Sequence, residues 1–208
     1  MGRPRTYTRD EVLRRSTELF ARKGYEGARL QELVEVTGLN RFSLYKEFGG
    51  KEGLFQAALE AYLGSLQALG GLLLRDPPGL ANLRAFYAAL LDHPFPYGCL
   101  AVNTIREKHV VPPRAFAAIE RFAASAEEGF QRNLAAARDA GELPSDTDPT
   151  ALAKFLSALD MGLLTYGLVA RDPGDRARII AVLEGFLGLG ADPGPGPAKG
   201  KRRGRPAR

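Results

Sequence analysis

Apolar residues recur every three or four positions along most of the chain, which is the spacing of one face of an α-helix. Val12, Leu13, Leu19 and Phe20 form such a face near the N-terminus. No segment alternates apolar and polar residues as a half-buried strand would. The pattern therefore predicts an all-α protein of about nine helices, at residues 8–23, 30–36, 41–47, 51–74, 79–91, 98–109, 113–140, 149–170 and 174–189.

Capping residues mark several of the predicted boundaries. Thr8 and Glu11 have the spacing of a capping box, in which both side chains accept backbone N–H groups of the first turn. Asp148 and Asp172 each precede a proline, a combination that favours the start of a helix. From residue 191 onward the sequence ADPGPGPAKGKRRGRPAR is too rich in Pro, Gly and charge to form a core, so 191–208 is predicted to be a disordered tail.

The composition indicates a folded protein without catalytic machinery. Of the 208 residues 45% are apolar, enough for a sizeable core. The single cysteine, Cys99, cannot form an internal disulfide, which fits a reducing cytoplasm. The two histidines and one cysteine have no metal-ligand spacing, and HExxH, GxSxG and P-loop motifs are absent, so no catalytic residue, metal or cofactor is expected. No secretory signal opens the chain and no run of eighteen apolar residues lacks a charge, so no spanning helix is expected.

Positive charge is concentrated at the two ends of the chain. Residues 1–52 carry a net charge of +3 and residues 199–208 carry +6, whereas 53–198 carry −4. Such ends suit a polyanionic partner. A nucleic acid is the first candidate and an anionic membrane surface is the second.

Residues 29–48, RLQELVEVTGLNRFSLYKEF, have the layout of a helix-turn-helix with Gly38 at the turn. Leu33, Val36, Leu39 and Leu44 are placed to hold the two short helices together. The second helix then presents Arg41, Ser43, Tyr45 and Lys46 to DNA. Basic groups neutralise phosphates, and hydroxyls bond to phosphate oxygens or base edges.

Residues 8–55 resemble the N-terminal domain of the TetR family of bacterial transcription regulators. The resemblance lies in ELFARKGYEGARLQELVEVTGLNRFSLYKEFGGKEGLF, and GCLAVNTIRE (98–107) is similar to a segment found in many members. It implies phosphate or base contacts by Ser43 and Tyr45, and a phosphate contact by Lys51. Phe42 stands where the family usually has glycine, which puts an apolar ring near the DNA. The predicted DNA-binding residues are Arg41, Phe42, Ser43, Tyr45, Lys46 and Lys51.

The resemblance also implies a division of the chain into a DNA-binding domain (1–50), a helical domain that binds a small molecule and dimerises (51–190), and the tail (191–208). Polar groups on the apolar helices are candidates for the effector pocket: Tyr87, His93, Tyr97, Cys99, Asn103, His109, Asp160 and Tyr166. The last two helices are expected to pair with those of a second copy through Leu152, Phe155, Leu159, Leu163, Ile179, Leu183 and Phe186. Cys99 is either a buried structural residue or a thiol sensor.

The tail contains Arg203-Gly204-Arg205-Pro206, which resembles the AT-hook, a segment that binds the minor groove of A·T-rich DNA. Contacts to phosphates alone are the alternative for Arg202, Arg203 and Arg205. Together these features predict a cytoplasmic, nucleoid-associated homodimer that binds a palindromic operator as double-stranded DNA and is released by a small-molecule effector. An activator of the same family, or a helical small-molecule-binding protein with only non-specific anion affinity, are the alternatives.

Overall fold

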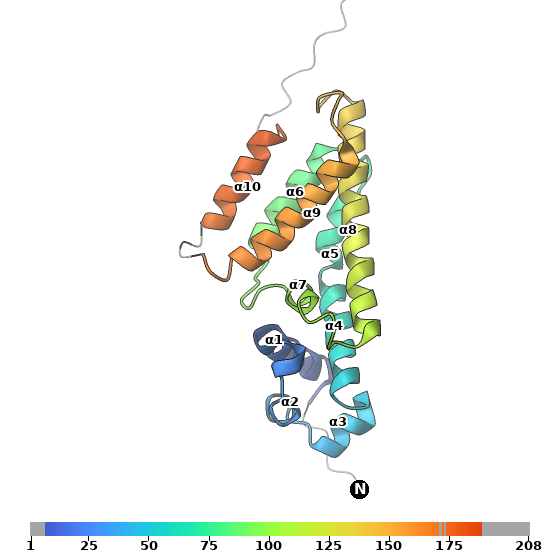
Figure 1. The fold of residues 1–208 in the computed structure, drawn as a ribbon, viewed down its shortest axis with the longest axis vertical. Coiled ribbons are helices and arrows are strands. Elements are labelled where there is room, and N and C mark those ends of the chain that lie inside the picture. The colour runs from blue at the N-terminus through green and yellow to red at the C-terminus, as the bar shows by residue number, and fades with distance from the viewer. Residues whose placement is uncertain (1–6, 171, 173, 189–208) are drawn as a thin grey trace, which may run out of the picture.

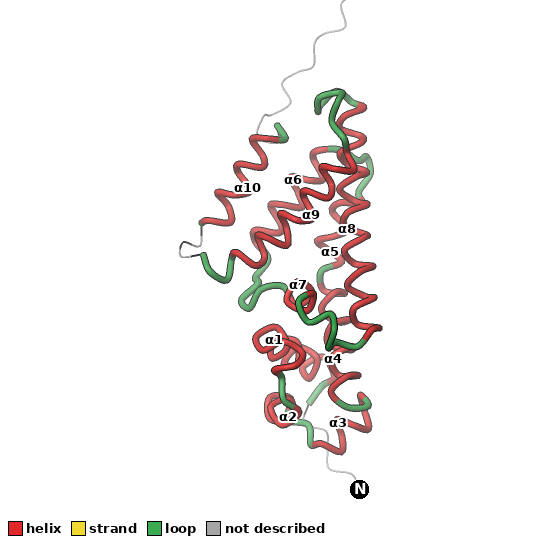
Figure 2. Tube along the Cα trace, in the orientation of Figure 1, coloured by secondary structure: helices red, strands yellow, loops and turns green. Residues whose placement is uncertain are grey.

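The computed structural model describes residues 7–170, 172 and 174–188. In this part of the chain it contains only helices and their connections, so the all-α prediction is confirmed (Figures 1 and 2). The described residues form ten α-helices and one 3-10 helix: α1 (Arg9–Gly27), α2 (Leu30–Thr37), α3 (Arg41–Phe48), α4 (Lys51–Ser65), α5 (Gln67–Gly71), η1 (Leu72–Leu74), α6 (Leu80–Asp92), α7 (Leu100–Ile105), α8 (Pro113–Asp139), α9 (Pro149–Tyr166) and α10 (Asp175–Phe186).

The predicted caps begin two of these helices. The Thr8 hydroxyl accepts a hydrogen bond from the Glu11 N–H (3.2 Å) at the start of α1. The Asp148 carboxylate accepts the N–H groups of Thr150 and Ala151 (2.9 and 3.2 Å) at the start of α9. The first helix was expected to end at Gly24, but the backbone only bends there, with φ 75° and ψ 174°, and helical structure resumes as far as Gly27.

The segment 51–74 was expected to be one helix and is divided into α4, α5 and η1. Gly64, Gly70 and Gly71 explain the interruptions, since glycine favours a helix interior less than other residues except proline. By length and composition alone this segment could cross a membrane, with a mean hydropathy of 1.3, a test that core helices of other proteins also pass. In the structure, however, α4 packs against α1 and α8, and its inner face is fully buried.

Two apolar cores follow one another along the molecule. The first joins α1–α4 to the start of α7 and of α8, and at its centre Phe20 and Phe55 meet edge to face with ring centroids 4.8 Å apart. The second joins η1, α6, α9 and α10 to the C-terminal half of α8. Figure 1 shows α1–α3 at one end of the molecule and α6, α9 and α10 toward the other. The domain boundary at residue 50 stays a prediction, and the first core crosses it.

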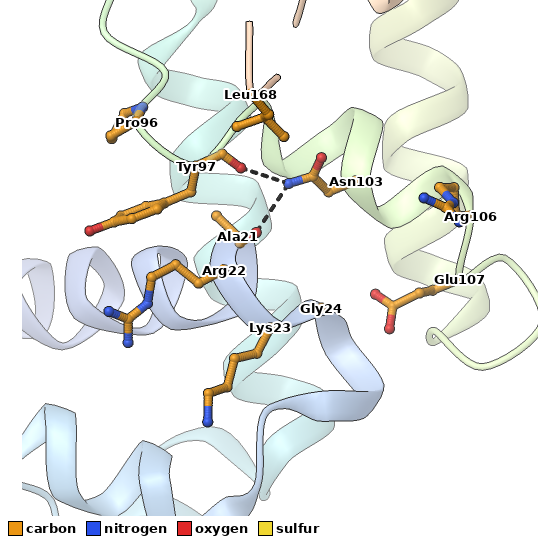
Figure 3. A pocket seen from close by; sticks show the side chains of 10 residues that line it. All are labelled: Ala21, Arg22, Lys23, Gly24, Pro96, Tyr97, Asn103, Arg106, Glu107 and Leu168. Atoms are coloured by element: carbon orange, nitrogen blue, oxygen red, sulfur yellow. Dashed lines mark hydrogen bonds between the residues drawn. The ribbon is translucent and has the colours of Figure 1, made fainter. Parts of the chain in front are cut away.

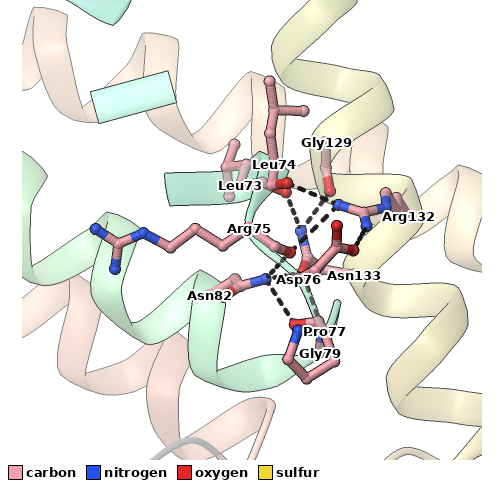
Figure 4. A network of polar contacts seen from close by, with 10 residues as sticks. All are labelled: Leu73, Leu74, Arg75, Asp76, Pro77, Gly79, Asn82, Gly129, Arg132 and Asn133. Atoms are coloured by element: carbon pink, nitrogen blue, oxygen red, sulfur yellow. Dashed lines mark hydrogen bonds and ion pairs between the residues drawn. The ribbon is translucent and has the colours of Figure 1, made fainter. Parts of the chain in front are cut away.

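A buried polar network anchors the connection between η1 and α6 (Figure 4). The Asn133 amide donates to the carbonyls of Leu73 and Gly129 (both 2.7 Å). Its oxygen accepts from the Gly79 N–H and from the Asn82 amide (both 2.9 Å). Asn133 thus uses its full hydrogen-bonding capacity to fix this loop to α8.

Candidate nucleic-acid interface and ligand cavity

The helix-turn-helix is held together by three leucines. Leu33 of α2, Leu39 of the turn and Leu44 of α3 are at most 1% exposed. Gly38 ends α2 with φ 72°, a left-handed conformation that glycine adopts without strain. The buried Thr37 hydroxyl donates to the Leu33 carbonyl (2.5 Å) and accepts from the Leu39 N–H (3.3 Å). The turn between α2 and α3 is therefore fixed by packing and by hydrogen bonds.

The opposite face of α3 is exposed, as predicted for a helix that enters a DNA groove. Arg41, Phe42, Tyr45 and Lys46 are all exposed, and the Phe42 ring is 75% exposed. The Arg41 guanidinium lies over the Tyr45 ring, 5.9 Å from its centroid. Ser43 is half-buried, and its N–H donates to the Asn40 side chain that caps the helix (2.7 Å). The structure thus brings four of the six predicted DNA-binding side chains onto one continuous surface.

Lys51 lies apart from that surface, at the start of α4. Its Nζ donates to the Glu26 carbonyl (3.2 Å) and lies 4.7 Å from the centroid of the Tyr25 ring. Partial burial lowers the pKa of the Lys51 ammonium, while the nearby Glu107 and Glu26 oppose this shift. Lys51 therefore connects α4 to the end of α1, and its contact with a phosphate stays a prediction.

The end of α1 is also tied to α7, at the edge of an open groove (Figure 3). The Glu107 carboxylate, just after α7, accepts the N–H groups of Tyr25 and Glu26 (2.7 and 3.0 Å). The Asn103 amide of α7 donates to the Ala21 carbonyl (3.1 Å) and to the Tyr97 carbonyl (2.9 Å). The two hydrogen bonds to the Glu107 carboxylate are charge-assisted, and such bonds are stronger than neutral ones. We call this set of contacts the α1–α7 junction.

A more enclosed cavity of about 520 Å³ lies in the larger helical part of the molecule. Its volume is within the usual range for small-molecule sites. Most of its wall is aliphatic or aromatic, with side chains from α5 to α9 and the connections between them. The polar residues of the wall are Gln67, Cys99, Ser125, Glu127, Ser157 and Asp160.

The structure brings together some of the predicted pocket residues. Cys99 and Asp160 line the cavity, and the buried Tyr87 hydroxyl lies near the Asp160 carboxyl without meeting hydrogen-bond geometry with it. Burial raises the pKa of Asp160 to about 8, and the Tyr87 hydroxyl partly opposes this shift. Burial, together with Asp160, also raises the pKa of Tyr87.

The remaining candidates lie outside this cavity. Tyr97 and Asn103 line the groove at the α1–α7 junction. The His93 ring packs beside Phe95, with centroids 4.4 Å apart, and His109 and Tyr166 are exposed. Within the described residues, no three His, Cys, Asp or Glu side chains are grouped so that they could hold a metal ion.

The outer face of α9 and α10 exposes large apolar side chains. Phe155 is 57% exposed, Phe186 is 89% exposed, and Val182 beside them is 65% exposed. Of the other residues predicted for a dimer interface, Leu152, Leu159 and Ile179 are partly buried against the second core. Leu163 and Leu183 are 2% and 5% exposed, so they lie in the core of one protomer and not on its surface.

Two site residues were not singled out from the sequence. Glu107 joins the two parts of the protein, and Ser157 lies one turn before Asp160 in the cavity wall. The quoted segment GCLAVNTIRE ends at Glu107, but nothing in it shows that the carboxylate reaches α1. The tail residues Arg202, Arg203 and Arg205 lie outside the described residues.

Comparison with known proteins agrees with this architecture. Residues 12–58 match the family described as "Bacterial regulatory proteins, tetR family", and residues 79–183 match "Tetracyclin repressor-like, C-terminal domain". The chain is 33% identical over 178 residues to the uncharacterized HTH-type transcriptional regulator YezE of Bacillus subtilis, covering 83% of this chain and 92% of the relative. It is 32% identical over 168 residues to the HTH-type transcriptional repressor ComR of Escherichia coli, covering 78% of this chain and 80% of ComR.

One solved structure with a similar fold contains operator DNA. A cysteine mutant of the TetR family regulator CifR, in complex with a 26-bp double-strand operator, matches with a TM-score of 0.70 and 31% identity, over 89% of this chain and 98% of that one. These relatives are transcription regulators and not enzymes. With both parts of the family matched and the helix-turn-helix formed as expected, the chain belongs to the TetR family of bacterial transcription regulators.

Proposed function

We propose that this protein is a repressor that binds a palindromic operator as a homodimer and leaves it when a small molecule occupies the cavity. The observation that carries this proposal is the exposed surface of α3, where Arg41, Phe42, Tyr45 and Lys46 stand on a helix fixed from behind by buried leucines. Lys46 and Arg41 suit phosphates or guanine edges, and an apolar ring such as Phe42 suits the methyl group of thymine.

A dimer is needed because one helix-turn-helix covers only half of an operator. The exposed apolar face of α9 and α10, with Phe155, Val182 and Phe186, supplies a self-complementary surface for a two-fold interface. In such a dimer the two α3 helices would enter successive major grooves, which are about 34–36 Å apart. A protein bound to its operator in this way would lie on the bacterial chromosome, in association with the nucleoid.

Release would follow from contacts between the cavity and the α1–α7 junction. The cavity wall includes Val102 and Ile105 of α7, and Glu107 follows directly and holds the end of α1. A ligand that binds better to a shifted position of α7 would favour a state in which α1 and α4, which contact α7, and the α3 helix that packs against α4, are wrongly spaced for DNA. The relative ComR is named a repressor, which supports repression over activation here.

The proposal is tested by fluorescence anisotropy with duplexes from the DNA upstream of the gene, compared with a scrambled duplex of equal length. Lys46→Ala should weaken operator binding by about 1–3 kcal/mol, since it removes a direct contact. The matched control is Arg121→Ala, which removes an exposed cation from α8, a helix outside the helix-turn-helix.

The protein must also prefer one palindromic duplex steeply over random DNA. If wild-type protein binds all duplexes alike, the alternative of a helical small-molecule-binding protein with basic ends is correct. Equal losses for Lys46→Ala and Arg121→Ala would show that the α3 surface has no special role.

A further inference from the structure

Asp160 occupies a position where the helix pattern calls for an apolar residue. Ala153, Leu156 and Leu163 of α9 are buried at intervals of three and seven, and Asp160 continues that stripe one turn after Leu156. The stripe faces the second core and the cavity, so this carboxyl group is held among aliphatic and aromatic side chains. A carboxyl group is rarely placed there without a partner, because burial disfavours its charged form.

Three polar atoms around this position have no hydrogen-bond partner in the described part of the chain. They are Oδ1 of Asp160, the hydroxyl oxygen of Ser157 and the hydroxyl oxygen of Tyr87. All three are buried, and Asp160 and Ser157 line the cavity. Buried polar groups are almost always paired in native proteins, so an unpaired cluster at the wall of a cavity indicates where a ligand would supply the partner.

The charge of the cavity wall specifies the kind of partner. Its two ionisable carboxyl groups are Asp160 and Glu127, and no lysine, arginine or histidine lines it within the described residues. The nearby Arg176 of α10 donates to the Leu90 carbonyl (2.7 Å) and lies over the Phe95 ring, 5.6 Å from its centroid, but is not part of the wall. An anionic ligand would therefore find no positive partner in this wall, whereas a cation would find a carboxyl group that can ionise to pair with it.

The rest of the wall matches an apolar molecular body. Leu66, Leu69, Phe86, Ile119 and Phe122 are among the residues that enclose it. The aromatic rings of such a wall also attract an ammonium group through the negative faces of their π systems. Burial raises the pKa of Asp160 to about 8, so without a ligand this carboxyl group is largely neutral near pH 7. A bound cation would favour its ionised form.

We propose that the effector of this cavity is an apolar molecule carrying a basic nitrogen, whose ammonium group donates a hydrogen bond to Asp160. The Ser157 hydroxyl, in the same wall, would accept one of its remaining N–H groups, while the Tyr87 hydroxyl lies near the Asp160 carboxyl behind it. This assignment rests on the proposed function only in calling the ligand an effector. The binding chemistry itself does not depend on DNA.

The test compares three probes with the same phenyl group and similar chain length that differ in their head group: 4-phenylbutylamine, 4-phenylbutanol and 4-phenylbutyrate. Binding to the full-length protein is measured by isothermal titration calorimetry at neutral pH. The amine should bind about tenfold or more tightly than the alcohol, since a charge-assisted hydrogen bond replaces a neutral one, and the carboxylate should bind weakest. Failure of the amine to bind at millimolar concentration, or a preference for the alcohol or the carboxylate, would overturn the proposal.

Asp160→Asn keeps the shape of the side chain and removes its charge, so it should abolish the preference for the amine over the alcohol. The matched control is Glu127→Gln, which removes the other carboxylate of the wall and should preserve most of the preference. A preference that persists in Asp160→Asn would also overturn the assignment. If Asp160→Asn does not fold, the three-probe comparison on unmodified protein still decides.

Operator release is then measured separately, by adding 4-phenylbutylamine to the protein–operator complex. Preferential binding of the amine without release would leave the cavity chemistry standing and refute ligand-released repression. Release by the alcohol and the amine at equal concentrations would support the proposed function and overturn the assignment of a basic nitrogen.

Discussion

Replacing Asn133 with alanine should destabilise the protein strongly, because this side chain makes four hydrogen bonds, three of them buried (Figure 4). The Asn82 amide would lose its hydrogen bond to Asn133 but keep those to the carbonyls of Arg75 and Pro77, so this contribution to the destabilisation is small. The Leu73 carbonyl and the Gly79 N–H lose their Asn133 partner, at about 1–3 kcal/mol each. With the small cavity that alanine leaves, we expect the free energy of unfolding to fall by about 3–5 kcal/mol, a large part of the 5–15 kcal/mol typical of a native protein.

Urea unfolding followed by circular dichroism measures this change, at one fixed protein concentration because the stability of a dimer depends on it. Asn133→Leu fills the same space without hydrogen bonds and should be destabilised nearly as much as Asn133→Ala. A loss below about 1 kcal/mol in Asn133→Leu would refute the assignment of the stability to the polar network.

Asn133→Asp adds a pH-dependent check. Its carboxyl group would face the carbonyl oxygens of Leu73 and Gly129, which raises its pKa in the folded state above that of the unfolded chain. The folded protein then holds a proton that the unfolded chain releases, so stability must fall as pH rises through that interval. The destabilisation relative to wild type should be larger at pH 8 than at pH 5.

Asp160→Asn should remove a decline in stability with rising pH in urea unfolding between pH 5 and pH 8. Because the pKa of Asp160 is raised to about 8, only the unfolded chain loses this proton over that pH range, and the free energy of unfolding falls by up to about 1.4 kcal/mol per pH unit. Parallel pH profiles for the variant and the wild type would show that Asp160 causes no such decline. Glu107→Gln should speed hydrogen exchange at the Tyr25 and Glu26 amides several-fold, since one carboxylate acceptor is lost; unchanged exchange would mean that the junction contact contributes little. Deleting 199–208 should flatten the salt dependence of operator binding by about 0.9 in log–log slope per lost phosphate contact, and A·T-rich flanks should lose more if the tail binds the minor groove.

The helices could be predicted from the sequence because their apolar stripes and caps are local features. Thr8 and Asp148 cap helices as their neighbours indicated, and Gly38 makes the turn of the helix-turn-helix. The division of 51–74 was missed because its apolar spacing continues through Leu66. Each glycine near an interruption could also be accommodated inside a continuous helix.

The exposed surface of α3 was also predictable, because the helical period alone decides which residues of one short helix lie on the face opposite to its buried leucine. The cavity was not, because it depends on which side chains of separate helices meet. Cys99 and Asp160 are 61 positions apart in the sequence and share one wall, whereas Asn103, close to Cys99, points to the α1–α7 junction instead. Sequence spacing could name these polar residues as candidates but could not separate the two groups.

The first core has a consequence for engineering this regulator. It joins Phe20 and Phe55 to Cys99, Leu100 and residues of α8, and Cys99 also lines the ligand cavity. The first fifty residues are thus not a cassette that can be cut out and grafted onto another regulator, because the graft would expose half of a shared interior. Operator specificity should instead be transferable by exchanging only the outward-facing side chains of α3, which contribute nothing to that interior.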